Sequence, residues 1–322
     1  MVLGAANKAL AVRSWTARRV LVPALAAIFC VVCPGAGSAG ERPVTSGGIA
    51  VFVSIEPQAY FVKRIGGGHV TVDVLVGAGR SPHTYEPTPR QMAALARSRV
   101  YFTVGVPIER SIVPKVVRMN PALAVVDTTQ GIEFLPADTG GTHEDGKGEA
   151  GHLHAEGGPD PHVWLDPRRV KIMAGTITRA LEAIDPAHAR AYRANLDTFR
   201  ADLDRLDAEL AETFTPLRGS KVYVYHGAFG YLAHAYGFTQ VPVEIGGKEP
   251  SARELARLIE KARAEGVRVI FVQPQFSRRK AEVVAAQIGG AVVAINPLPA
   301  DYMTEMRRMA RSMRDAAALT RR

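Results

Sequence analysis

Residues 49–76 read IAVFVSIEPQAYFVKRIGGGHVTVDVLV and hold the pattern that decides the fold. Two runs rich in β-branched residues, 49–54 and 70–76, predict strands on either side of a helix that begins at Pro57. A strand, a helix and a second strand in succession form the unit that builds a parallel sheet. The alternation continues with helices expected over 89–97 and 108–119 and strands expected over 99–104 and 124–126.

A second set of alternating elements fills the C-terminal part of the chain. We expect strands over 221–225, 240–243, 267–272 and 291–295, and helices over 229–236, 251–265, 278–288 and from Tyr302 onward. A helix over 166–184 precedes this set, and another begins at Asp185-Pro186. In the latter, apolar residues recur every three to four positions, at Tyr192, Leu196, Phe199, Leu203, Leu206 and Leu210. About thirty helical residues span about 45 Å, which is enough to connect two lobes.

These elements predict an α/β fold of two lobes, each a mainly parallel sheet flanked by helices, joined by a long rigid linking helix. The expected parts are a signal peptide over 1–39, an N-terminal α/β lobe over 48–184 with a flexible His- and acid-rich loop over 135–160, a linking helix over 185–216 and a C-terminal α/β lobe over 217–322.

The N-terminal segment has the features of an export signal. Three arginines precede an apolar run over 20–32, which is shorter than the roughly 20 residues of a membrane-spanning helix. Small residues follow, and cleavage is expected after Ala39. A lipid anchor on Cys33 is not favoured, because Val32 stands where a small residue is expected. We therefore expect a periplasmic or otherwise extracytoplasmic protein.

Charge and cysteine content exclude several kinds of site. The net charge of +9 falls to +5 (36 basic minus 31 acidic residues) when residues 1–39 are removed. Acidic and basic residues are interspersed, which argues against nucleic-acid binding. Both cysteines, Cys30 and Cys33, lie in the predicted signal, so the mature chain has no disulfide and no thiolate metal site. A bound metal would be held by nitrogen and oxygen ligands.

Three of the nine histidines follow or flank predicted strand ends, where a site between lobes would draw its ligands. His83 lies in a proline-rich loop, His162 lies just ahead of a helix, and His226 follows a strand. One such histidine alone is typical of a hydrogen-bonded structural residue. Three from separate elements can form most of a tetrahedral zinc shell. The remaining ordered candidates, His69, His188 and His234, are expected to lie outside the site.

Four segments together resemble the zinc/manganese solute-binding proteins of ABC transporters. They are 81–89 (SPHTYEPTP), 160–167 (DPHVWLDP), 225–237 (YHGAFGYLAHAYG) and 247–251 (GKEPS), and the resemblance covers essentially the whole mature chain in order. It implies two α/β lobes linked by one rigid helix and a metal site formed by His83, His162 and His226. It also implies a monomer without enzymatic activity, whose partners are the metal ion and the membrane permease of the transporter.

The metal implied by this resemblance is Zn²⁺, carried as the transported ligand, with Mn²⁺ as the alternative. Zinc-type members have a histidine at the position of His226, whereas manganese-type members tend to have a carboxylate. Manganese also prefers oxygen ligands, while zinc readily accepts three nitrogens.

The fourth position departs from the family pattern. Many relatives place an aspartate after the last strand, and the matching residue here is Asn296, whose amide oxygen is an uncharged and weaker ligand. We expect Asn296 or a water molecule to complete the shell, with Asp301 as the alternative. Asp160, Trp164 and Glu244 are candidates to orient the ligands or to shield the site.

The predicted loop adds a second candidate metal-binding region. It contains His143, His152 and His154 among acidic residues, and the resemblance implies a secondary zinc-collecting role. The alternative is a solvated loop in which these histidines have no function.

Two other functional classes remain open. A zinc hydrolase would need an open coordination position and a general base, and the chain has no His-Glu-x-x-His or Gly-x-Ser-x-Gly motif. A surface adhesin would hold a structural metal that resists chelators until the protein unfolds, whereas a transport receptor must release its ion.

Overall fold

The computed structural model describes residues 48–136, 159–244 and 248–320. The predicted signal peptide and the three histidines of the predicted loop lie outside these residues. Within the described ranges, every helix is too short or too polar to cross a lipid bilayer.

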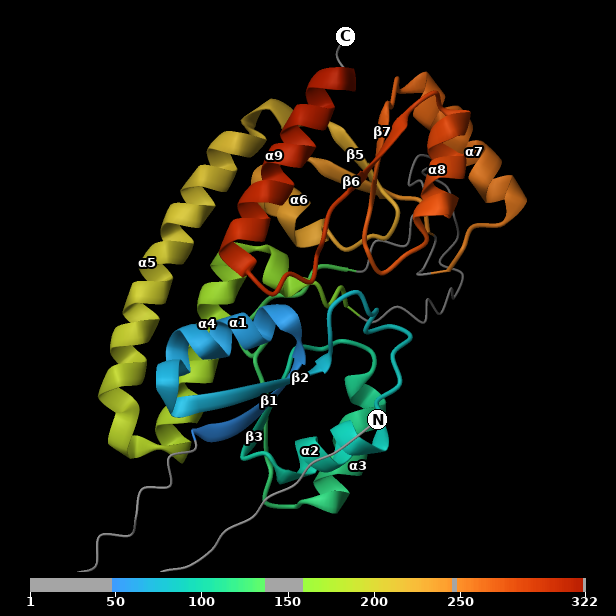
Figure 1. Cartoon of the computed structure of the whole chain (residues 1–322). Helices are drawn as coiled ribbons and strands as arrows, with labels where there is room; N and C mark the ends of the chain where they lie inside the picture. Colours follow the sequence, from blue (N-terminus) through green and yellow to red (C-terminus); the bar gives the residue numbers. More distant parts are fainter. Residues whose placement is uncertain (1–47, 137–158, 245–247, 321–322) are drawn as a thin grey trace, which may run out of the picture. The chain divides into compact units, whose positions relative to one another are not determined.

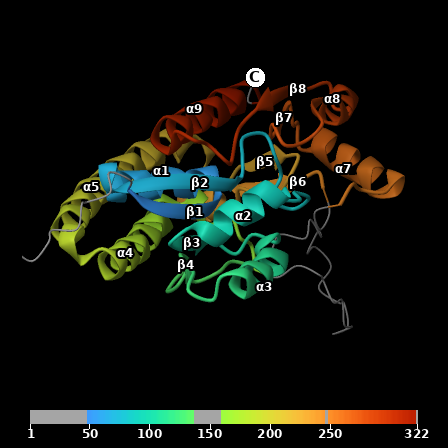
Figure 2. The same cartoon turned by 60° about the horizontal axis from the view of Figure 1, so that its bottom comes forward.

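The first sheet is parallel throughout, with strand order β2-β1-β3-β4. Its elements are β1 (Ile49–Ile55), α1 (Glu56–Gly66), the 3₁₀ turn η1 (Gly67–His69), β2 (Val70–Val76), α2 (Pro89–Arg97), β3 (Val100–Thr103), α3 (Glu109–Met119) and β4 (Ala124–Asp127). The connection from β1 to β2 runs across the sheet in one direction, and those from β2 to β3 and from β3 to β4 run in the other. With right-handed crossovers, α1 therefore lies on one face of the sheet, and α2 and α3 lie on the other (Figures 1 and 2). A capping box between Thr88 and Gln91 fixes the start of α2.

The second sheet repeats this topology with the order β6-β5-β7-β8, again all parallel. Its elements are β5 (Lys221–Val224), α6 (Gly230–Tyr236), β6 (Thr239–Pro242), α7 (Ala252–Ala264), β7 (Val269–Val272), α8 (Arg278–Gln287), β8 (Ala291–Ala294) and α9 (Tyr302–Thr320). A second capping box, between Ser251 and Glu254, begins α7. Each strand pattern predicted from the sequence is thus present, within two residues at its ends.

Helix α5 (Ala189–Phe214) lies beside both sheets and is about 39 Å long (Figure 1). Its buried stripe is the predicted one, extended to Phe214. The helix starts later than expected: α4 (Pro167–Ile184) ends first, and the 3₁₀ turn η3 (Pro186–His188) intervenes. The reason is Pro186, which disfavours helical geometry at Asp185, where φ is −139°. The two-lobed α/β fold with a long linking helix is confirmed, while the exact lobe boundaries stay a prediction.

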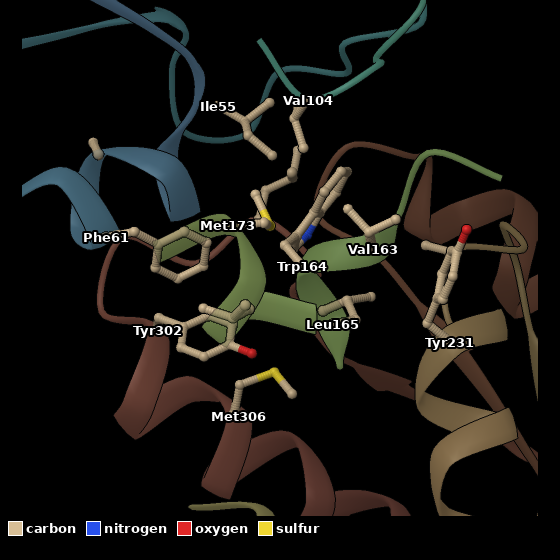
Figure 3. Packing of buried hydrophobic residues seen from close by; sticks show 14 of the residues in the cluster. Ile55, Phe61, Val104, Val163, Trp164, Leu165, Met173, Tyr231, Tyr302 and Met306 are labelled. Atoms are coloured by element: carbon tan, nitrogen blue, oxygen red, sulfur yellow. The ribbon is translucent and has the colours of Figure 1, made fainter. Parts of the chain in front are cut away.

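One hydrophobic cluster includes both faces of the first sheet and one face of the second, and residues 46–322 form one unit. It includes α1, α4, α5, α6 and α9. At its centre lies the 3₁₀ turn η2 (Val163–Leu165), with Trp164 completely buried near Tyr302 and Met306 of α9 (Figure 3). Tyr302 packs edge-on against Phe61 of α1, with ring centroids 5.0 Å apart. A separate cluster fills the outer face of the second sheet beneath α7 and α8.

Candidate metal centre

The structure brings three distant histidines together. One ring nitrogen from each of His83, His162 and His226 lies within 4.8 Å of the other two. The ring centroids are 5.9 Å apart for His83 and His162, 5.0 Å for His83 and His226, and 5.4 Å for His162 and His226. Since zinc–nitrogen bonds are about 2 Å long, nitrogens about 3.3 Å apart could share one ion, so small side-chain shifts suffice.

His162 is held by its own segment of chain. Asp160 Oδ1 accepts a hydrogen bond from the backbone amide of His162 at 2.9 Å and pairs with its Nδ1 at 2.6 Å. Just beyond, the indole Nε1 of Trp164 donates to the carbonyl of Pro297 at 2.7 Å, which ties η2 to the loop before α9. A carboxylate only accepts, so Nδ1 of His162 carries the hydrogen and Nε2 keeps the lone pair.

His226 is held by residues that follow other strands. Its Nδ1 lies 2.8 Å from Glu244 Oε2, and its backbone exchanges two hydrogen bonds with the side chain of Gln273, at 3.2 and 2.7 Å. Phe276 stacks on the imidazole with centroids 4.9 Å apart. Nε2 of His226 is buried and has no hydrogen-bond partner among the described residues. A buried nitrogen in this state is suited to a metal ion.

His83 differs because it is exposed and lies in the loop between β2 and α2. Its backbone amide donates to Ser81 Oγ at 3.3 Å, and Thr84 N donates to the carbonyl of Ser81 at 3.2 Å. These bonds shape the turn that presents the imidazole and do not contact the ring itself.

Electrostatics favour neutral imidazoles and a bound cation. Although part of the His83 side chain is exposed, the protein atoms packed around its ring partly desolvate it, and this effect, followed by the neighbouring His162 and His226, lowers its pKa. Burial also lowers the pKa of His226, against the opposing effect of Glu244. Both rings are therefore unprotonated near pH 7, the form that binds metal. Behind the rings, the carboxylates of Asp160 and Glu244 are buried and contact the imidazoles of His162 and His226, an arrangement that suits a cation between the rings.

Two adjoining pockets surround the three imidazoles. The smaller, of about 20 Å³, is lined by all three histidines together with Trp164 and Gln275. The larger, of about 330 Å³, is lined by His83 and His226 and also by Glu244, Glu249 and Lys280. The first has room for one small sphere and the second for several water molecules, so the centre has an ion-sized space and a hydrated approach.

The candidates for the fourth position have other partners in the structure. Asn296 Oδ1 accepts hydrogen bonds from Leu298 N at 3.0 Å and from Gln275 Nε2 at 3.3 Å. Asp301 is exposed, and its carboxylate accepts a hydrogen bond from Thr304 N at the start of α9. Among the described residues, the group of histidine and acidic side chains close enough to hold one ion does not include Asp301.

The remaining described histidines lie apart from this centre. His69 stacks on His188 with centroids 3.8 Å apart, and Asp185 Oδ2 lies 2.7 Å from Nδ1 of His188. His234 is exposed on α6. His143, His152 and His154 lie outside the described residues, so their role stays a prediction.

Of the residues predicted to support the site, Asp160 and Glu244 contact His162 and His226, and Trp164 lines the smaller pocket; their role toward a metal ion stays a prediction. Sequence reasoning missed Gln273, Gln275 and Phe276, whose segment follows the carboxyl end of β7. Their position was the available signal, since ligands in parallel sheets bind beyond those ends. Glutamine and phenylalanine carry no metal-binding pattern of their own, so their residue types added no signal to that position.

Known proteins resemble this chain over most of its length. The model of the family described as "Zinc-uptake complex component A periplasmic" matches residues 51–316. The high-affinity zinc uptake system protein ZnuA of Bacillus subtilis is 29% identical over 279 residues, covering 85% of this chain and 86% of the relative. The zinc-binding lipoprotein AdcA of Streptococcus pneumoniae is 29% identical over 286 residues. The match covers 87% of this chain but only 54% of the length of AdcA.

Solved structures give the same result. A crystal structure of ZnuA has a TM-score of 0.75 and 36% identity, covering 83% of this chain and 98% of that one. A zinc-bound ZnuA variant that lacks residues 138–173 in its own numbering has a TM-score of 0.74 and 37% identity, covering 84% and 98%. With a family model that spans most of its length, the chain belongs to the ZnuA family of zinc-uptake components.

Proposed function

We propose that this protein is an extracytoplasmic receptor that binds one Zn²⁺ through His83, His162 and His226 and delivers it to an ABC-type importer. The observation that carries the proposal is the convergence of three ring nitrogens, one from each histidine, within 4.8 Å. In addition, Nε2 of His226 is buried and has no hydrogen-bond partner in the described parts of the chain. Two of the rings are also oriented by carboxylates, the arrangement typical of metal-binding histidines.

Zinc is favoured over manganese by the donor set. Three neutral imidazole nitrogens suit zinc, whereas manganese prefers carboxylate, carbonyl and water oxygens. Asp160 and Glu244 hydrogen-bond to the Nδ1 atoms of His162 and His226, and the group of side chains close enough to share one ion, within the described residues, consists of the three histidines. Competition between Zn²⁺ and Mn²⁺ for the purified protein tests this preference, and equal affinities would contradict it.

The proposed mechanism is binding and release without a chemical step. A hydrolase would need a general base beside the ion, and the nearest carboxylates are already engaged with imidazole Nδ1 atoms. We therefore expect no zinc-dependent ester or peptide hydrolysis. We also expect chelators to remove zinc from the folded protein, which separates a transport receptor from a protein with a structural metal.

The wider setting of the receptor is also part of the proposal. Residues 1–39 direct export and are removed, the mature chain acts as a monomer in the periplasm or an equivalent compartment, and a membrane permease receives the ion. The N-terminal sequence and mass of the exported protein test this, with a start at Gly40 expected.

The central experiment is a zinc titration of the mature protein against a competing chelator. We expect one tightly bound zinc per chain and, for His226→Ala, an affinity reduced by more than about 100-fold, beyond the usual effect of losing a residue that only supports a ligand. The matched control is His234→Ala, which removes an exposed histidine from α6 eight residues later. Equal zinc binding by His226→Ala, His234→Ala and the unaltered protein would refute the assignment.

A further inference from the structure

Gln275 lies in the segment after β7, beside the candidate metal centre. Its side chain lines both pockets, each time together with His83 and His226. Its amide nitrogen donates to Asn296 Oδ1 at 3.3 Å. Its carbonyl oxygen, Oε1, is buried and has no hydrogen-bond partner among the described residues. Such an atom needs an explanation, because buried polar atoms are nearly always paired.

The orientation of this amide is fixed by its neighbour. Asn296 Oδ1 is an acceptor that already binds Leu298 N at 3.0 Å, and Asn296 Nδ2 is directed to the carbonyl of Leu298 at 3.3 Å. Only the NH₂ group of Gln275 can therefore face Asn296 Oδ1, since a flipped amide would set two carbonyl oxygens against each other. Oε1 is thereby turned away from Asn296.

The segment that carries Gln275 is attached to His226 on both sides. Gln273 exchanges two hydrogen bonds with the backbone of His226, and Phe276 stacks on its imidazole at 4.9 Å. The position of Gln275 is therefore set relative to the ring whose Nε2 is the unpaired nitrogen of the site.

We infer that Gln275 Oε1 accepts a hydrogen bond from a water molecule that occupies the fourth position around the ion. The inference rests on the proposed function and makes Gln275 a positioning residue. Water that binds zinc becomes a stronger hydrogen-bond donor, and the 330 Å³ pocket gives it access. A neutral amide accepts this bond without taking the proton, so it does not act as the base of a hydrolase. Asn296 then acts through Gln275, by holding the amide in place.

The test compares Gln275→Leu and Gln275→Glu in the mature protein, with Zn²⁺ affinity measured by chelator competition. Leucine removes the acceptor at similar volume, and we expect about 10-fold weaker binding, the lower end for loss of a partner that supports a metal ligand. Glutamate keeps an acceptor oxygen but loses the amide that donates to Asn296 Oδ1, so we expect it to bind zinc more tightly than the leucine variant. Gln287→Leu, on the exposed end of α8, is the matched control and should change nothing.

Asn296→Ala adds a second readout. We expect a smaller loss of affinity than for Gln275→Leu, and no further loss when both changes are combined, because both act on one hydrogen bond. Additive losses would overturn the inference, as would unchanged zinc binding by Gln275→Leu or equal weakening by the leucine and glutamate variants. These failures leave the proposed function standing as long as His226→Ala still abolishes tight binding; if His226→Ala binds normally, the proposed function fails first.

Discussion

The two sides of the metal centre are built differently. His162 and His226 are buried, and each has a carboxylate on Nδ1 and a hydrogen-bonded backbone. His83 is exposed, and within the described ranges its hydrogen bond is a local one from the backbone amide to Ser81 Oγ. Under the proposed function, His162 and His226 would be a fixed pair of ligands that determines the geometry, and His83 would be a third ligand that adapts to the ion. Mutations on the two sides should therefore differ in effect.

The largest expected effect separates the buried ligands from the exposed one. His162→Ala should weaken zinc binding by more than about 100-fold, because it leaves the buried Asp160 carboxylate without its partner as well as removing a ligand. His83→Ala should cost less, because water reaches the exposed corner and can take the place of the ring. Chelator competition measures the zinc affinity of both variants. Equal losses of affinity would contradict the difference between the buried and the exposed histidines.

The next effect concerns the carboxylates behind the buried rings. Glu244→Gln keeps an acceptor for His226 Nδ1 but removes a buried negative charge, and we expect zinc binding to weaken by about 10- to 100-fold. Glu282→Gln makes the same change on the exposed face of α8 and should leave zinc binding unaltered. A null result for Glu244→Gln would mean that the fixed side does not depend on its carboxylate.

A smaller effect on zinc binding is expected for Trp164, which connects the segment of His162 to the hydrophobic core. Trp164→Phe keeps most of the buried ring but removes the hydrogen bond to the carbonyl of Pro297. We expect the free energy of unfolding to fall by about 1 kcal/mol, with zinc affinity reduced less than by Glu244→Gln. Denaturant unfolding at fixed pH measures the first quantity. A loss of zinc affinity without a loss of stability would instead place Trp164 among the residues that determine binding directly.

The smallest effect belongs to the exposed side. Ser81→Ala removes one long hydrogen bond from the turn that carries His83, and we expect zinc affinity to change by about threefold or less. Chelator competition on the same scale as the other variants would detect a larger loss. Such a loss would mean that the His83 turn is as tightly organised as the fixed pair.

The fold could be predicted because its signals are local. The strand–helix–strand pattern of 49–76, the capping residues Thr88 and Ser251, and the buried stripe of α5 each act over a few residues. The late start of α5 was the main difference in element boundaries. It follows from Pro186, a signal present in the sequence that was taken as a helix start when it first produces a 3₁₀ turn.

The candidate centre was predictable only in part. The positions of the three histidines beyond predicted strand ends, and the resemblance, indicated which imidazoles should meet. The partners of those imidazoles depend on side chains from different loops: Glu244 lies 18 residues from His226, and Gln273 lies 47 residues from it. No periodicity encodes such contacts, so the orientation of the rings and the unpaired oxygen of Gln275 became apparent only in three dimensions.

The continuous hydrophobic cluster beneath the three histidines limits the conformational changes by which the protein can release a bound ion. A wide separation of the two lobes would expose Trp164, Tyr302 and Phe61 to water. This would cost roughly 1.5–3 kcal/mol of free energy for each large apolar side chain uncovered. A large separation of the two lobes is therefore disfavoured. We expect the ion to leave through a local movement of the turn that carries His83, which is the least restrained of the three histidine segments. The metal-free and metal-bound proteins should accordingly have almost the same surface. A partner protein that distinguishes them would therefore have to contact the turn that carries His83.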